Sequence, residues 1–301
     1  CVWRVMKTRR CYTVPLPGAA PLTLGERTLV MGIVNVTPDS FSDGGLCLDP
    51  GRAVAHALEL EAAGADVLDV GGESTRPGAA ALPADEELAR VAPVLRGLMG
   101  AVRVPVSVDT YKADVARVAL DLGATMVNDV SGLLYDPELA EVVASRGAAL
   151  VLMHTRGRSR EMYQAAEYRN VGREVAGELA DQVAVAVGAG VERTQIIVDP
   201  GLGFAKRAEH SYAALASLAD LVSLDRPILV GPSRKSFLAT DGDAGPRARD
   251  WETAAAVTAA VLHGAHLVRV HEVADLIRVV RVADRIQAHR PETSVSGTEA
   301  E

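Results

Sequence analysis

Polar and charged side chains occur at the ends of eight short apolar segments of this 301-residue chain. In chain order they are Asn35, Asp69 and Glu73, Asp109, Asn128 and Asp129, His154, Asp199, then Ser233, Arg234 and Lys235, and finally Arg269, His271 and Glu272. Carboxylates and amides exchange hydrogen bonds with polar ligands, and arginine or lysine can hold an anion. Asn128, Asp199 and Arg269 belong to buried-strand segments, where leaving water costs free energy. Asp109, taken alone, is equally well explained as a helix cap.

The apolar segments have the composition of buried parallel strands. They read TLVMGIVNV (28–36), DVLDVGG (66–72), VPVSVD (104–109), TMVNDVSG (125–132), ALVLMH (149–154), QIIVDPG (195–201), PILVGPS (227–233) and HLVRVHE (266–272). Their residues are apolar in succession rather than alternately, which is typical of strands covered on both faces. Helices are expected between them, at 84–99, 111–122, 171–189, 209–222, 252–263 and 273–288. Two more have readable ends, marked by Asp49, Pro50 and Gly64 and by Asp136, Pro137 and Gly147.

This alternation predicts an α/β fold, a single TIM (β/α)8 barrel with parallel strands. The carboxyl ends of all strands in a barrel meet at one rim, so the active site is expected at the C-terminal rim. An open doubly wound sheet is the alternative, but no Gly-rich dinucleotide fingerprint follows the first strand. We expect an N-terminal arm at 1–24, the barrel domain at 25–290 and a disordered tail at 291–301.

Composition limits the classes of partner. Hydrophobic residues make up 49% and charged residues 23%, which is ordinary for a globular protein. The net charge of −8 argues against nucleic acid or an anionic membrane as a partner. No run approaches the roughly 20 apolar residues of a membrane span. Three cysteines, at positions 1, 11 and 47, lack metal-ligand spacing, which favours a reducing cytoplasm.

Seven of the polar segments together resemble dihydropteroate synthase. They are NVTPDSFSDGG (35–45), GGESTRPGA (71–79), SVDT (107–110), NDVSG (128–132), DPGLGFAK (199–206), SRKSFL (233–238) and RVHEV (269–273). The resemblance extends from about residue 24 to 286. It implies a barrel fold and a transferase of folate biosynthesis. This enzyme joins p-aminobenzoate to 6-hydroxymethyl-7,8-dihydropterin pyrophosphate and releases pyrophosphate, with Mg²⁺ as cofactor.

The resemblance implies a pterin pocket made of Asp109, Asn128, Asp199 and Lys235. A pterin edge offers an amino group, ring N–H groups, ring nitrogens and a carbonyl oxygen. Carboxylates, an amide and a cation are the matching set. Met153 and Phe204 are apolar walls of this pocket by the same resemblance, and core packing is an equally good explanation of both residues.

The leaving pyrophosphate requires cations in a site poor in water. Arg269 and His271 lie two residues apart on one strand, so both point the same way, and Arg76 and Ser233 can reach the region from neighbouring loops. We expect Arg76, Lys235, Arg269 and His271 to be catalytic. By resemblance Asn35 is the metal ligand, a neutral oxygen suited to Mg²⁺.

In the family, the loop after the first strand and the STRPG loop fold over the substrates. Phe41, Thr75 and Pro77 are then expected to contact p-aminobenzoate, after the pterin pyrophosphate has bound. Gly44 and Gly45 permit the backbone change. An aniline nitrogen is unprotonated at neutral pH, so the mechanism needs no strong general base, and the sequence shows no obvious one.

Other interpretations stay open at this point. One is a catalytically inactive pterin-binding paralogue; another is a folate-dependent corrinoid methyltransferase, which shares the barrel. A third is a phosphate-binding barrel isomerase or aldolase, although no buried Schiff-base lysine is evident in the sequence.

Pro232, Thr155 and the segment 240–250 depart from the family pattern. Family members are commonly homodimers, and the apolar stripe of VADLIRVVRVADRI (273–286) is either such a contact or the inner face of the last helix, which we favour. His154 is expected to be a buried structural histidine rather than a catalyst.

Overall fold

Eight parallel strands form the centre of the molecule. The computed structural model describes residues 9–37, 49–74, 81–158, 162–164, 166–240 and 245–289. The strands are β3 (Leu29–Asn35), β4 (Val67–Gly71), β5 (Val106–Asp109), β6 (Met126–Asp129), β7 (Ala149–Met153), β8 (Ile196–Asp199), β9 (Leu229–Val230) and β10 (Leu267–Val270). They are ordered β8-β7-β6-β5-β4-β3-β10-β9. A parallel bridge between Val198 and Ile228 joins the two ends of this sheet. The predicted barrel is confirmed.

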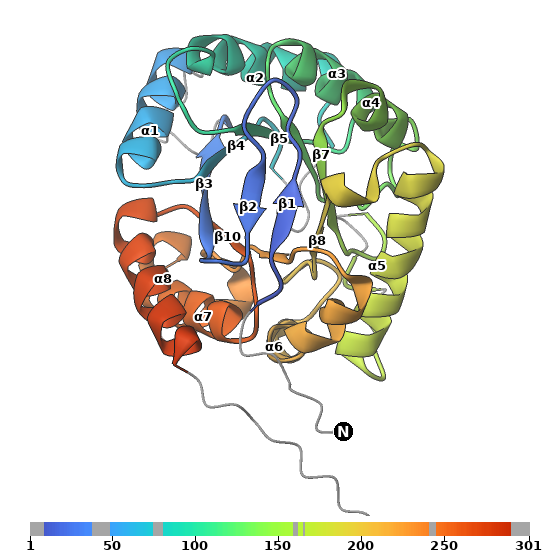
Figure 1. Ribbon diagram of the computed structural model, residues 1–301, viewed down its shortest axis with the longest axis vertical. Helices are drawn as coiled ribbons and strands as arrows, with labels where there is room; N and C mark the ends of the chain where they lie inside the picture. Colours follow the sequence, from blue (N-terminus) through green and yellow to red (C-terminus); the bar gives the residue numbers. More distant parts are fainter. Residues whose placement is uncertain are drawn as a thin grey trace, which may run out of the picture.

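Helices cover the outside of the strand ring (Figure 1). They are α1 (Pro50–Ala62), α2 (Ala84–Leu98), α3 (Ala113–Asp121), α4 (Leu139–Arg146), α5 (Val171–Gly188), α6 (Ala208–Ala216), α7 (Asp250–Leu262) and α8 (Val273–Ala288). Short 3-10 turns, η2 (Arg193–Gln195), η3 (Leu218–Leu224), η4 (Ser236–Leu238) and η5 (Pro246–Ala248), complete the loops. The inner face of α8 buries Leu276, Ile277 and Val280, as expected for its apolar stripe.

One of the two predicted helix caps is confirmed and the other is wrong. Asp49 accepts a hydrogen bond from the Gly51 backbone N at 2.8 Å, at the start of α1. Asp136 does not begin a helix at Pro137, because α4 starts at Leu139. Its carboxylate instead accepts from the backbone N of Ala113 at 2.8 Å and of Glu138 at 3.1 Å, so it ties together two loops.

The N-terminal segment closes one end of the barrel. Residues of β1 (Tyr12–Val14) and β2 (Leu22–Leu24) pair as an antiparallel hairpin, which lies across the centre of the strand ring in Figure 1. Val14 and Leu24 pack in one apolar cluster with residues at the beginnings of the barrel strands, among them Leu29, Met126 and Leu267. The described part of the arm, to which sequence analysis gave no role, therefore seals the interior at the end opposite the rim.

We expect the hairpin to stabilise the fold without taking part in chemistry. Leu24 is fully buried, so Leu24→Ala is expected to cost about 3 kcal/mol through lost packing and a cavity. Thermal denaturation should then show a melting temperature lower by roughly 10 °C, with unchanged kcat. Val185, exposed on α5, supplies the control Val185→Ala. A Leu24→Ala protein as stable as that control would contradict this role.

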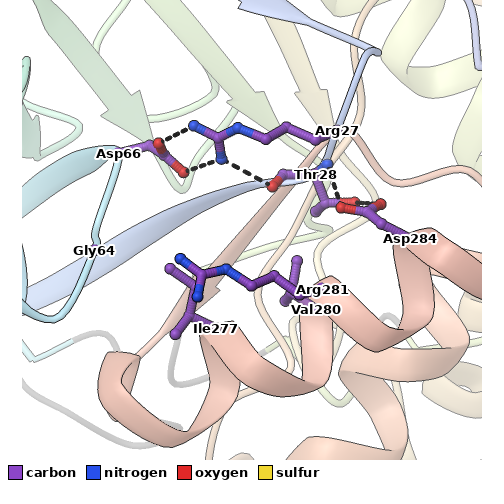
Figure 2. Close-up of a pocket in the computed structure, with 8 residues that line it drawn as sticks. All are labelled: Arg27, Thr28, Gly64, Asp66, Ile277, Val280, Arg281 and Asp284. Carbon is purple, nitrogen blue, oxygen red and sulfur yellow. Dashed lines mark hydrogen bonds and ion pairs between the residues drawn. The ribbon is translucent and has the colours of Figure 1, made fainter.

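Ion pairs reinforce the same end of the barrel. Figure 2 shows Arg27 reaching Asp66 with both guanidinium branches and Thr28 bonded to Asp284 of α8. Arg9 also pairs with Asp284. These contacts tie the segment between β2 and β3 to α8 and to the residue just before β4. They surround a cavity of about 290 Å³.

Candidate active site

Four of the predicted pterin-binding residues come together at the opposite end, where the strands finish. Asp109 ends β5, Asn128 belongs to β6 and Asp199 ends β8. Parallel register places Asp109 beside Asn128 and Met153 beside Asp199. Lys235 follows β9 and points its ammonium group to the loop after β8, where it donates to the Leu202 carbonyl.

A buried charge network occupies the middle of this rim. Arg269, from β10, donates through Nε to Asp69 Oδ2 and through one terminal nitrogen to Asp109 Oδ2, both at 2.6 Å. Asn128 donates its amide N–H to the same Asp69 oxygen at 2.9 Å. Asp69 is fully buried, and it is the residue that orients both Arg269 and Asn128. Sequence analysis placed Asp69 near a strand end but gave it no role.

Two carboxylate oxygens of this network still need hydrogen-bond donors. Asp69 Oδ1 and Asp109 Oδ1 are buried and have no partner among the described residues. Burial raises the pKa of Asp109 to about 7, although Arg269 opposes the change. Such unsatisfied acceptors are costly, so the arrangement fits a ligand that brings N–H groups to the rim.

The loop after β8 contributes further groups to the rim. Asp199 accepts from the Gly201 backbone N at 2.7 Å through Oδ1. Gly201 has φ +66°, and an added Cβ would lie 1.9 Å from the His154 carbonyl oxygen, so only glycine fits. The Lys235 ammonium lies 4.5 Å from the centre of the Phe204 ring. Burial lowers the pKa of Lys235 to about 8, although Asp199 opposes the change.

Ser233 and His271 form a hydrogen-bonded pair beside the strand that carries Arg269. Two contacts join Ser233 and His271. Ser233 Oγ lies 3.0 Å from His271 Nδ1, and it also accepts from the His271 backbone N at 3.2 Å. Arg234 points elsewhere, because its guanidinium makes two bonds to Asp250 at 2.8 and 3.1 Å. Its backbone has φ +59°, so this ion pair helps to hold a strained turn beside Lys235.

The remaining predicted site residues fall into two groups. Asn35 ends β3 and is paired with Gly71 at the end of β4, and Met153 ends β7 with 3% exposure. Phe41, Thr75, Arg76 and Pro77 lie outside the described residues, as do Gly44 and Gly45. Glu73, just before the STRPG loop, accepts from the Leu82 backbone N at 3.2 Å and from the Tyr111 hydroxyl at 3.0 Å, which ties the two ends of that segment together.

His154 has the structural role expected of it, and its partner is a residue that sequence analysis missed. The imidazole is fully buried between Glu178 and Lys206. Lys206 is itself buried with 1% exposure, and sequence analysis gave it no role. A lysine in a Gly-rich loop is ordinarily solvated, which is why nothing in the sequence indicated its burial.

Asp129 proves to be a turn former. Its carboxylate accepts from the backbone N of Ser131 at 2.8 Å and of Leu133 at 2.6 Å. Burial raises the pKa of Asp129 to about 6 against these bonds. It therefore shapes the loop after β6.

Comparison with known proteins identifies the class to which this rim belongs. Residues 31–271 match the family described as pterin binding enzyme, and the chain belongs to that family. It is 44% identical to the dihydropteroate synthase of Synechocystis, over 87% of this chain and 91% of that protein. It is 50% identical to the dihydropteroate synthase of Mycobacterium leprae, over 81% of this chain and 88% of that protein.

Solved structures agree. The Xanthomonas albilineans dihydropteroate synthase with 4-aminobenzoic acid superposes with a TM-score of 0.83 and 42% identity, covering 93% of this chain and all of that one. The Yersinia pestis dihydropteroate synthase with a sulfonamide drug superposes with a TM-score of 0.85 and 36% identity, covering 92% of this chain and 99% of that one. Fold and relatives place the chain among the dihydropteroate synthases, transferases of folate biosynthesis, rather than among corrinoid methyltransferases or aldolases.

Among the described residues no helix has the length and apolar character needed to cross a membrane.

Proposed function

We propose that this chain condenses 6-hydroxymethyl-7,8-dihydropterin pyrophosphate with p-aminobenzoate at the C-terminal rim, giving 7,8-dihydropteroate and pyrophosphate. The observation that supports it most is the set of buried groups that converge at the rim. Asp109 lies beside Asn128, and the charges of Asp199 and Lys235 each oppose the effect of burial on the pKa of the other. The unpartnered Asp109 oxygen is suited to a ring N–H of the pterin. Met153 and Phe204 then line the flat faces of the ring.

The pyrophosphate group is assigned to the cations beside this pocket. Arg269 is fixed by Asp69 and Asp109 before any ligand arrives, so its guanidinium needs little reorganisation as negative charge develops on the leaving group. His271 and Ser233 form a hydrogen-bonded pair on the same side, and both can donate to phosphate oxygens. Departure of pyrophosphate leaves the pterin methylene electron-poor, and the ring stabilises it by donating electrons.

The second substrate attacks from the open side of the rim. We assign Phe41, Thr75, Arg76 and Pro77 to the p-aminobenzoate site by their place in the family motifs. The aniline nitrogen forms the new C–N bond to the methylene as the bond to pyrophosphate breaks, and then loses a proton to solvent. The enzyme's main contributions are orientation and charge stabilisation.

Mg²⁺ is proposed as the cofactor, with Asn35 as its protein ligand. Asn35 ends β3, the strand that pairs with β10, and β10 carries Arg269. The described residues contain no cluster of three or more His, Cys, Asp or Glu side chains that could hold a metal ion. A single neutral oxygen fits a hard cation that takes its other ligands from water and phosphate. When bound, Mg²⁺ would neutralise charge on the leaving pyrophosphate.

The assay for this function is dihydropteroate formation by the purified protein. Product should require both substrates and appear in step with pyrophosphate, and EDTA should abolish it until Mg²⁺ is restored. Arg76→Ala should lower kcat/KM by about 10²-fold or more, since it removes one donor to the developing charge. Tight pterin binding with no turnover would favour the inactive paralogue instead, and Pro232 would be the first residue to revert.

The two shifted pKa values predict a bell-shaped pH dependence of pterin affinity. Asp109 must be ionised to accept from the pterin, so affinity should rise as pH increases through about 7. Lys235 must be protonated to donate, so affinity should fall above about 8. Titration of 6-hydroxymethylpterin between pH 5.5 and 9.5, corrected for the ligand's own ionisation, measures both limbs. Asp109→Asn should remove the acid limb alone, and an unchanged acid limb in that variant would refute the assignment.

Assembly and location are also proposals. We propose a homodimer in a reducing cytoplasm, with small molecules as its other partners. Val282 and Ile286 are 57% and 49% exposed on the outer side of α8, which supports an apolar contact there. Cys11 is a free, exposed thiol, as a reducing compartment would keep it. Light scattering would measure the mass in solution. The expected domain limits, 1–24, 25–290 and 291–301, remain predictions.

A further inference from the structure

Lys206 is a buried amine for which the proposed mechanism has no use. It is among the largest fully buried side chains, with 1% exposure. Its Nζ donates to His154 Nδ1 at 2.7 Å and to the Phe204 carbonyl at 3.1 Å, and it forms no ion pair among the described residues. Burial lowers the pKa of Lys206 well below its ordinary value, although Asp199 opposes the change. A group this costly to bury needs a compensating role.

The contact to His154 fixes the protonation of the ring. Glu178 Oε2 lies 3.0 Å from Nε2, and a carboxylate oxygen can only accept, so the proton of the neutral imidazole is on Nε2 and Nδ1 accepts from Lys206. Burial lowers the pKa of His154 to about 4, which keeps the ring neutral. Glu178 is held in turn by Arg156, whose guanidinium lies 4.0 Å from the centre of the Tyr168 ring. A continuous chain of hydrogen bonds therefore runs from the buried amine to a carboxylate with 39% exposure.

This chain of hydrogen bonds ends on the loop that forms one side of the proposed pterin site. Three donors hold carbonyls of the loop: Lys235 bonds Leu202, Lys206 bonds Phe204, and the Tyr168 hydroxyl bonds Ala205 at 3.0 Å. The loop needs such support, because Ala205 has φ +47° and such backbone conformations are strained for residues other than glycine. The Phe204 ring faces Lys235, one of the groups assigned to the pterin.

We propose that Lys206 is a positioning residue for the pterin, oriented through His154 by Glu178, and that it holds Phe204 and the Asp199–Lys206 loop in the shape that the ring requires. The proposal rests on the proposed function, since it assumes that the pterin binds between Asp199, Phe204 and Lys235. It predicts that breaking this chain of hydrogen bonds at any point weakens pterin binding, and that keeping the acceptor at position 154 limits the loss.

The test is the equilibrium Kd of 6-hydroxymethylpterin, measured by calorimetry on the full chain. Lys206→Met and His154→Leu should each raise the Kd by about 10- to 100-fold, as expected for a lost hydrogen bond in a buried site. His154→Asn should lose much less than His154→Leu and no more than Glu178→Ala, because the Asn oxygen can replace Nδ1 as an acceptor although the contact to Glu178 is lost. Glu178→Ala, at a partly exposed position, should show an intermediate loss.

His266 provides the matched control. It is another buried histidine, its pKa is also lowered to about 4 by burial, and it lies at the hairpin end, where it contacts the Ile228 backbone N and the Arg10 carbonyl. His266→Leu should lower the melting temperature without changing the pterin Kd. If Lys206→Met does not fold, the difference between His154→Leu and His154→Asn decides.

Two results would overturn the proposal. One is an unchanged pterin Kd in Lys206→Met, His154→Leu and Glu178→Ala. The other is a loss of affinity that follows the melting temperature in every variant, His266→Leu included. A wild-type protein that does not bind the pterin would contradict the proposed function itself, which keeps the two failures distinct.

Discussion

Arg269→Met should lower kcat/KM by about 10²- to 10³-fold, because it removes a preorganised cation from the leaving pyrophosphate. The same change leaves two carboxylates, Asp69 and Asp109, buried without the guanidinium that both now share. Loss of one partner from a buried ion pair costs about 3–5 kcal/mol. Steady-state kinetics and urea unfolding on the same preparation would measure the two effects.

Two further variants isolate the role of Arg269. Arg269→Lys keeps the charge but cannot reach both carboxylates in a planar fork, so it should recover stability more than activity. Arg146→Met breaks the ion pair with Asp121 on the outside of the barrel and should change neither quantity measurably. Retention of near wild-type kcat/KM in Arg269→Met would show that the pyrophosphate does not lie where we place it.

Asp199→Asn is expected to have the second large effect, on the pterin itself. Asp199 is 5% exposed and uses one oxygen for the Gly201 backbone N, so its second oxygen is available to the ligand. An amide in this place presents N–H where the pterin also presents N–H. We expect the Kd of 6-hydroxymethylpterin to rise by about 10²- to 10³-fold, as for a polar site left mismatched.

The matched control for this change is Asp121→Asn, because Asp121 forms an ion pair on the surface, far from the rim. It should bind the pterin as the wild type does. The Asp199→Asn protein should also keep its affinity for inorganic pyrophosphate, since that anion is assigned to Arg269 and His271. Equal losses of pterin and pyrophosphate affinity would indicate general disruption of the rim rather than loss of pterin recognition.

The barrel and most of its rim could be predicted from the sequence, because buried parallel strands leave a strong signal. Continuous apolar runs located all eight strands, and their ends located Asp109, Asn128 and Asp199. The N-terminal hairpin escaped prediction, since three-residue strands such as β1 and β2 are too short to show a period. Its packing depends on the barrel mouth, which exists only in three dimensions.

The pairing of charges was beyond the reach of the sequence. Asp69 meets Arg269 across 200 positions of the chain, and which strand-end residues face one another depends on the register and tilt of the barrel. Lys206 escaped for a different reason, because its burial depends on His154 and Tyr168 from other loops. Local sequence carries the type and order of the rim residues but not which of them bind one another.

The most direct test of the account is a crystal structure of this protein with 6-hydroxymethyl-7,8-dihydropterin pyrophosphate bound. We predict the pterin edge within hydrogen-bond distance of Asp109, Asn128 and Asp199, with the pyrophosphate against Arg269 and His271. A ligand seated elsewhere, for example in the cavity between Arg27 and α8 (Figure 2), would contradict the assignment of the rim as the active site.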